Sequence, residues 1–226
     1  MMTNLFSMFD PSTNLFYFNL SLNWLSMIIL MMIMPMKFWL MNNNISMIFK
    51  KFIITLNKEM KMIINKKKNL NFNLILISLM FIIMVNNFMG LFPYIFTCTS
   101  HMNINLSMAL PIWLSMMLYL MMNKLNNMFI HLVPQNTPNL LIPFMVMIES
   151  ISLIIRPITL TIRLTANMIA GHLLLTLMSS LSKNLSKIFI SLLIVFQTIL
   201  MSLEMAVSII QAYVFTILIT LYLSEI

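Results

Sequence analysis

The sequence is poor in charge, cysteine and glycine, and each shortage excludes a class of protein. Only 8% of the 226 residues are charged and 61% are hydrophobic, whereas about a quarter of the residues in a soluble domain are charged. A soluble globular fold is therefore excluded. The single cysteine, Cys98, cannot form an intramolecular disulfide. With two glycines in all, the chain has no Gly-rich loop that could cradle a phosphate, so a nucleotide site is not expected.

Methionine is abundant in this chain, whereas glycine and alanine are scarce. The chain contains 28 methionines but only two glycines. Residues with AT-rich codons dominate, and so much methionine suggests a code in which AUA also specifies Met, as in animal mitochondria. Since methionine ordinarily packs as a flexible apolar side chain, we interpret these residues as lipid-facing filler and expect no metal site.

Long apolar runs account for most of the chain. Several exceed the roughly 18–20 residues that a helix needs to cross a bilayer. They are continuous and not alternating, so they predict helices and not the strands of a barrel. We predict an all-α polytopic membrane protein with one membrane domain, 1–226, and about five membrane helices, at 18–41, 70–92, 106–122, 139–181 and 188–223. The second and third should form a hairpin.

The last two runs are too long for upright spans. At about 1.5 Å per residue they measure over 60 and over 50 Å, whereas the hydrocarbon core is about 30 Å thick. Neither contains a convincing loop signal. We therefore expect two long, steeply tilted helices, the first bent at Pro143 or Pro157.

A basic segment separates the first two spans. In residues 45–64 the lysines fall near one helical face, and apolar residues cover much of the rest. This pattern predicts an amphipathic helix lying on an anionic membrane surface. Seven of the 13 basic residues lie between 50 and 68. By the positive-inside rule, residues 45–68 should face the matrix, and the first span then places the N-terminus on the intermembrane side.

Ionisable side chains inside the two long runs are the candidate functional residues, because such groups are costly in a membrane. Glu149, Arg156 and Arg163 recur every seven residues, so they share one helical stripe. Asn167 is one turn beyond Arg163. His172 is nine residues beyond Arg163, about 180° around the helix. The arginine stripe and His172 should therefore face different surroundings.

The second long run repeats the spacing, because Glu204 and Gln211 are also seven residues apart. Five of the seven Gly and Ala residues of the chain lie in these two runs, namely Ala166, Ala170, Gly171, Ala206 and Ala212. Small residues allow helices to approach closely, so a helix of this or another chain should pass beside Arg163. Two interpretations of Arg163 stay open: a salt bridge within the helix pair, or a permanent cation that separates titratable groups in a proton path.

Several blocks of sequence resemble one family. "RLTANMIAGHLLL", preceded by "IESISLIIRP" and followed by "LEMAVSIIQAYVFTILITLYL", resembles subunit a of the rotary proton-translocating ATP synthases in its mitochondrially encoded form. The resemblance extends to "NLFSMFDPST" at the start and to the connector "HLVPQNTPNLLIPFMVMIE". It therefore covers nearly the whole chain.

The resemblance implies roles for the residues that match its motifs. Arg163 matches the essential arginine that faces the c-ring, and Asn167 and Gln211 match polar residues beside it. His172 and Glu204 match the polar pair of the access half-channel on the intermembrane side.

Two residues of the arginine stripe remain. Glu149 matches a carboxylate associated with the matrix half-channel. Arg156 matches no invariant charge of the family, so we interpret it as a structural residue with at most an accessory role.

The resemblance also implies partners and a location. The c-subunit ring and other membrane-sector and peripheral-stalk subunits are the expected protein partners, in the mitochondrial inner membrane. Such a subunit conducts protons through two offset half-channels and is not itself catalytic. We expect contact with the lipid bilayer, no cofactor and no nucleic acid.

Two other functions are compatible with a polytopic chain. A proton-coupled secondary transporter usually contains internal repeats and broken helices that meet at midplane, and the sequence has no convincing repeat. A haem- or quinone-binding subunit of a respiratory complex would need histidines inside the membrane, and only His172 qualifies.

Overall fold

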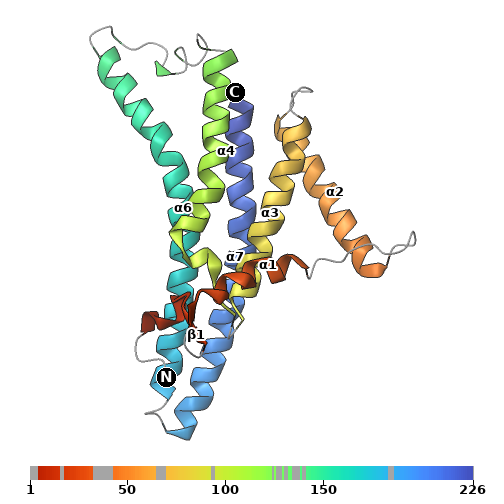
Figure 1. Ribbon diagram of the computed structural model, residues 1–226, viewed down its shortest axis with the longest axis vertical. Coiled ribbons are helices and arrows are strands. Elements are labelled where there is room, and N and C mark those ends of the chain that lie inside the picture. Colours follow the sequence, from red (N-terminus) through yellow and green to blue (C-terminus); the bar gives the residue numbers. More distant parts are fainter. Residues whose placement is uncertain are drawn as a thin grey trace.

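The chain is an all-α polytopic membrane protein. Its computed structural model describes residues 5–15, 18–32, 43–64, 70–92, 95–123, 125, 129, 132–133, 138, 141–182 and 186–225. The longer helices are α1 (Leu25–Met32), α2 (Asn44–Ile64), α3 (Leu70–Gly90), α4 (Met102–Asn123), α6 (Ile142–Leu181) and α7 (Lys187–Glu225). Figure 1 shows α3, α4, α6 and α7 as an elongated bundle with α2 at its side.

Four of the described helices are long and apolar enough to cross a membrane, at Phe72–Gly90, Met102–Met122, Ile142–Leu181 and Phe189–Leu223. The first span, which we predicted at 18–41, begins differently. A two-stranded hairpin, β1 (Thr13–Leu15) and β2 (Phe18–Leu20), takes its first residues, and the short helix η2 (Leu22–Trp24) leads into α1. Residues 33–42, which contain the rest of that predicted span, lie outside the described residues.

Local contacts hold the N-terminal residues in place before α1. Asn14 and Asn19 are cross-strand partners in the hairpin, and the Asn23 side chain donates a hydrogen bond to the carbonyl of Asp10 at 3.3 Å. Asn disfavours a helix interior because its side chain competes for backbone hydrogen bonds. The first α-helix, α1, therefore begins only after these asparagines.

Helices α6 and α7 form the long axis of the molecule. They contain 40 and 39 residues, about 60 Å each at 1.5 Å per residue, so they can cross a 30 Å hydrocarbon layer only obliquely. Pro143 lies in the first turn of α6, where proline is tolerated, and so it does not bend the helix. Pro157 lies inside α6. Figure 1 shows that α6 changes direction in the upper half of the picture.

We predicted that α3 and α4 form a hairpin, but the last helix, α7, lies between them (Figure 1). Helix α3 packs mainly against α7, and α4 packs mainly against α6. Figure 1 shows α7 between α3 and α4. The core lies where these four helices meet, and its most deeply buried members include Leu76, Leu164 and Phe215.

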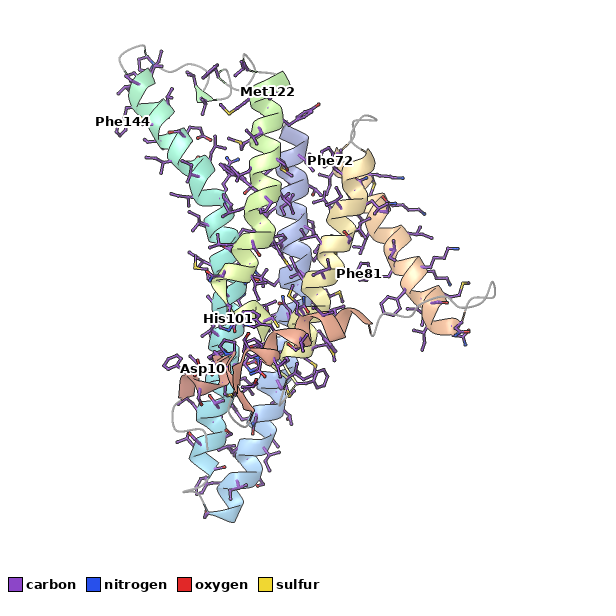
Figure 2. The ribbon with its side chains drawn as sticks, in the orientation of Figure 1. Asp10, Phe72, Phe81, His101, Met122 and Phe144 are labelled. Atoms are coloured by element: carbon purple, nitrogen blue, oxygen red, sulfur yellow. The ribbon has the colours of Figure 1, made fainter. Side chains whose placement is uncertain are left out.

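Helix α2 has the amphipathic pattern that its sequence predicts. Leu56, Met60 and Ile64 form its buried stripe, while Lys50, Lys51, Lys58 and Lys61 are exposed. Phe81 of α3 points toward α2 (Figure 2), and its ring centroid lies 6.4 Å from that of Phe49 and 5.8 Å from that of Phe52. The lysines at 66–68, and most of the connector at 123–138, lie outside the described residues.

One polar contact ties α2 to α7. The Tyr213 hydroxyl donates a hydrogen bond to Oε2 of Glu59 at 3.1 Å. Glu59 is the only acidic residue of α2, and Tyr213 lies two residues beyond Gln211. Sequence analysis did not single out this pair, which fixes the basic helix against the helix that carries Glu204 and Gln211.

Candidate functional site

The predicted arginine stripe and His172 do face different surroundings. Arg163 is exposed on the outer face of α6, whereas His172 is buried. Among the described residues, Arg163 has neither a hydrogen-bond partner nor an ion-pair partner. The first interpretation of Arg163, a salt bridge within the helix pair, therefore has no support from the described part of the chain.

Most of the exposed residues around Arg163 on α6 are apolar or small. Ile158 and Ile162 are exposed on α6, and so are the small residues Ala166 and Ala170. On insertion scales, an arginine at the centre of a lipid-exposed helix costs roughly 2.5–3.5 kcal/mol. An exposed arginine among exposed alanines therefore indicates a surface that another helix covers closely.

The small residues of the two long helices thus divide between two faces. Ala166, Ala170 and Ala206 are exposed, whereas Ala212 is fully buried and Gly171 is buried against α7. We predicted that a helix passes close to Arg163, without deciding whether it belonged to this chain. The exposed alanines lie on the outer surface, whereas Gly171 allows α6 and α7 to approach each other closely.

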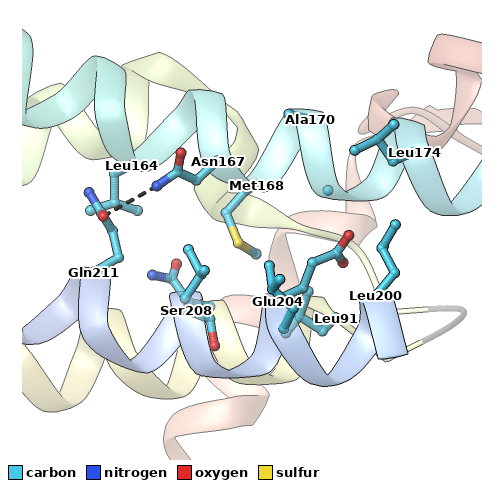
Figure 3. A pocket seen from close by; sticks show the side chains of 14 residues that line it. Leu91, Leu164, Asn167, Met168, Ala170, Leu174, Leu200, Glu204, Ser208 and Gln211 are labelled. Atoms are coloured by element: carbon cyan, nitrogen blue, oxygen red, sulfur yellow. Dashed lines mark hydrogen bonds between the residues drawn. The ribbon is translucent and has the colours of Figure 1, made fainter. Parts of the chain in front are cut away.

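A hydrogen bond between the two long helices lies one turn from Arg163. Nδ2 of Asn167 donates to Oε1 of Gln211 at 3.2 Å (Figure 3). Both residues also line a cavity of about 310 Å³ between α3, α6 and α7. The bond therefore fixes the rotation of α7 relative to the turn of α6 that carries Arg163.

Glu204 occupies the same cavity and presses against α6. Figure 3 shows its carboxyl group pointing toward α6 near Ala170. A Cβ added at Gly171 would lie 2.9 Å from Cδ of Glu204, closer than van der Waals contact allows. Both carboxyl oxygens are buried, and neither has a hydrogen-bond partner among the described residues. The absence of a side chain at Gly171 thus leaves the space that the Glu204 carboxyl group occupies.

His172 lines a second cavity, further along α6. This cavity has a volume of about 250 Å³ and is lined by residues of α6 and α7 and of the N-terminal segment. Leu91 lines both cavities and separates them. Nε2 of His172 is buried without a hydrogen-bond partner among the described residues. His172 and Glu204 are therefore close together, in neighbouring cavities, because Glu204 abuts the residue that precedes His172.

Glu149 and Arg156 lie at the other end of the arginine stripe. Nη2 of Arg156 is 3.6 Å from Oε1 of Glu149. The guanidinium carbon of Arg156 also lies 5.0 Å from the ring centroid of Tyr222 on α7, a distance at which cation–π attraction is effective. Arg156 therefore links Glu149 to α7 and has the contacts of a structural residue.

Asn87 is a site residue that sequence analysis missed. It lies on α3, lines the cavity of Glu204 and Gln211, and is only 1% exposed. Neither polar atom of its side chain has a hydrogen-bond partner among the described residues. Buried amides are nearly always hydrogen bonded, if need be to water. The pair Asn86-Asn87 inside an apolar run was a signal that could have led to it.

The arrangement has the groups that a proton path needs. Its titratable groups, Glu149, His172 and Glu204, are distributed along two helices that also carry the permanent cations Arg156 and Arg163. Among the described residues, no three His, Cys, Asp or Glu side chains gather in a way that could hold a metal ion.

Comparison with known proteins gives one consistent result. The family model described as ATP synthase A chain matches residues 15–224. The ATP synthase subunit a of Locusta migratoria is 54% identical over 226 residues, with 100% of both chains covered. Those of Drosophila simulans and Anopheles gambiae are 52% and 53% identical, again over 100% of both chains.

Proposed function

This chain belongs to the ATP synthase A chain family, and on that premise we propose how its residues conduct protons through the membrane sector of an ATP synthase. We infer that it is a stator subunit of the mitochondrial inner membrane. It conducts the protons that drive rotation of a neighbouring c-ring and performs no catalysis itself. The observation that carries this proposal is Arg163, an exposed cation without a partner among the described residues, on an apolar face with exposed alanines.

The partner of Arg163 is a carboxylate on each subunit of the c-ring. A carboxylate that faces lipid must be neutral, because an ion there is expensive. Opposite Arg163 it can ionise and release its proton. The pair has to be transient, because breaking a permanent buried pair by removing a partner typically costs about 3–5 kcal/mol and would stall rotation.

Protons reach the ring through His172 and Glu204 and leave it near Glu149. His172 lies at the Gly90 end of α3, whereas the lysine-rich segment precedes the other end of α3. The positive-inside rule therefore assigns His172 to the intermembrane side, with the N-terminus, and residues 45–68 to the matrix side.

The two ends of the path are offset along α6. Glu149 is 14 residues before Arg163 and His172 is nine residues after it, about 21 and 14 Å along a helix. The fixed charge of Arg163 between them prevents protons from passing directly. Asn167 and Gln211 set the position of Arg163 through their shared hydrogen bond, and Arg156 is an accessory residue that holds Glu149.

Other subunits of the complex complete the assembly. Membership of the family implies association with further ATP synthase subunits. We assign the exposed face around Arg163 to the c-ring, and the remaining outer surfaces to lipid and to membrane-sector and peripheral-stalk subunits. The membrane potential, worth about 2.3 kcal/mol per charge per 100 mV, drives protons along the path.

Replacement of Glu204 tests the proposed function. Glu204→Gln keeps the shape of the side chain but cannot carry a proton, and Glu204→Leu removes the polar group altogether. We expect both variants to assemble and both to slow proton-driven ATP synthesis by about a hundredfold or more, because a positioned proton-transfer group typically contributes at least that factor. The measurement is the synthesis rate in proteoliposomes that contain equal amounts of assembled complex. Wild-type rates in Glu204→Gln would show that Glu204 carries no protons.

A further inference from the structure

The N-terminal segment covers the cavity of His172. The short helix η1 (Leu5–Phe9) lies across the lower part of α6, close to the end of α3 (Figure 1). The Phe9 ring meets the imidazole of His172 edge to face, with 6.4 Å between the centroids and an interplanar angle of 86°. Such pairs hold rings in fixed relative orientations. Met8 and Phe9 also line the cavity, so this segment closes it on one side.

The rest of that cavity is mostly apolar, but it carries several polar groups that can bind water. Besides His172, its lining includes the side chains of Thr97, Thr176, Ser179 and Gln197. A volume of about 250 Å³ exceeds the space of one water, roughly 10–15 Å³ by this kind of measure, many times over. Water is expected beside the unpaired Nε2 of His172 and the amide of Gln197, because a roomy cavity holds water where polar partners are available.

Gln197 is the residue of α7 that extends the polar stripe into this cavity. It lies seven residues before Glu204, as Gln211 lies seven residues after it. The three side chains therefore fall on one face of α7. Gln197 is half-buried, and no described residue forms a hydrogen bond with it. An amide that is both donor and acceptor, placed beside His172, is suited to order water in the cavity.

We propose that Gln197 orders the water of this cavity, on the access route that the proposed function assigns to His172, and that Phe9 is the wall that orients His172 and excludes lipid. The inference rests on the proposed function, because it assumes that protons reach Glu204 by way of His172. It gives the N-terminal segment a role in proton uptake. Protons then pass Gln197 and His172 before they cross the Leu91 boundary to Glu204.

The test is the rate of ATP synthesis as a function of proton concentration on the His172 side, at fixed membrane potential. We expect Gln197→Leu to raise the half-saturating proton concentration by about fivefold, the factor that the loss of one ordinary hydrogen bond produces. The maximal rate should stay near that of the wild type. Gln197→Asn, which keeps an amide, should restore part of the loss. The control is Thr198→Val on the same helix, since Thr198 is exposed and its hydroxyl bonds only to the Val195 carbonyl.

The role of Phe9 is tested in the same assay. Phe9→Ala should raise the half-saturating proton concentration in the same direction, while Phe9→Trp, which keeps an aromatic wall, should behave nearly as the wild type. Phe6→Ala is the matched control, because Phe6 belongs to the same short helix but is 66% exposed. A purely structural loss would reduce the amount of assembled complex and the maximal rate, without a change in the half-saturating concentration.

The outcomes separate this inference from the proposed function. Unchanged proton dependence in both Gln197→Leu and Phe9→Ala, alongside a defective Glu204→Gln, would overturn the inference and leave the proposed function intact. Wild-type synthesis in Glu204→Gln would overturn both. A shift confined to Gln197→Leu would overturn the role of the N-terminal wall.

Discussion

Arg163→Ala should abolish proton-driven ATP synthesis and make the membrane leak protons. The guanidinium is the charged group that both attracts the ionised ring carboxylate and separates the two half-channels. We expect synthesis to fall by about a hundredfold or more, as the loss of one preorganised charged group in a water-poor site does. The passive leak should rise at the same time, because nothing then prevents a proton from crossing between the channels.

A matched variant separates charge from shape at this position. Arg163→Lys keeps the positive charge but loses the planar, delocalised guanidinium. We expect coupled synthesis to fail in this variant too, with a smaller increase in leak than in Arg163→Ala. Synthesis and leak are measured in the same vesicles for both variants. Normal synthesis in Arg163→Ala would reduce Arg163 to a structural residue.

Gly171→Ala should impair proton transfer without weakening the helix. The added Cβ would lie 2.9 Å from Cδ of Glu204, so the carboxyl group has to move. The cost in folding free energy is small, because the carboxyl is the end of a flexible side chain and alanine favours a helix interior over glycine by about 1 kcal/mol. Function is more sensitive, since a shift of about 1 Å in a reacting group can cost up to a hundredfold in rate. We expect at least a tenfold loss of synthesis in a fully assembled complex.

A second substitution tests whether the clash is the cause. Gly171→Ala combined with Glu204→Asp shortens the acidic side chain and leaves room for the new methyl group. The double variant should therefore be more active than Gly171→Ala alone. If Glu204→Asp fails to improve Gly171→Ala, or if Gly171→Ala is as active as the wild type, then the tight fit of Glu204 against α6 has no role in transfer.

The sequence predicts the helical elements well, because they depend on local signals. Lengths of apolar runs and turn residues gave five of the helices, and the bounds of α2 differ from the predicted 45–64 by one residue. The spacing of nine residues between Arg163 and His172 correctly predicted that the two side chains face different surroundings: Arg163 is exposed and His172 is buried. The hairpin at 13–20 was missed because its strands are only three residues long, too short for a period to be recognised.

These local patterns could not predict which helices and side chains pack against each other. The insertion of α7 between α3 and α4 depends on how the buried faces of the three helices fit together. The sequence of any one helix does not determine that fit. The contact of Gly171 with Glu204 joins residues 33 positions apart, and that of Phe9 with His172 joins residues much farther apart in the chain. By contrast, Asn87 carried a visible signal, a polar residue within an apolar run, and could have been found.

The central claim is that Arg163 faces a carboxylate-bearing helix of another subunit, and photo-cross-linking from its exposed face tests it most directly. A photoreactive amino acid at Ala166, which is exposed one turn from Arg163, would be activated in the assembled complex and its products identified by mass spectrometry. The account predicts cross-links to the c-subunit, on the helix that bears its membrane carboxylate. Products confined to lipid, or to other residues of this chain, would contradict it.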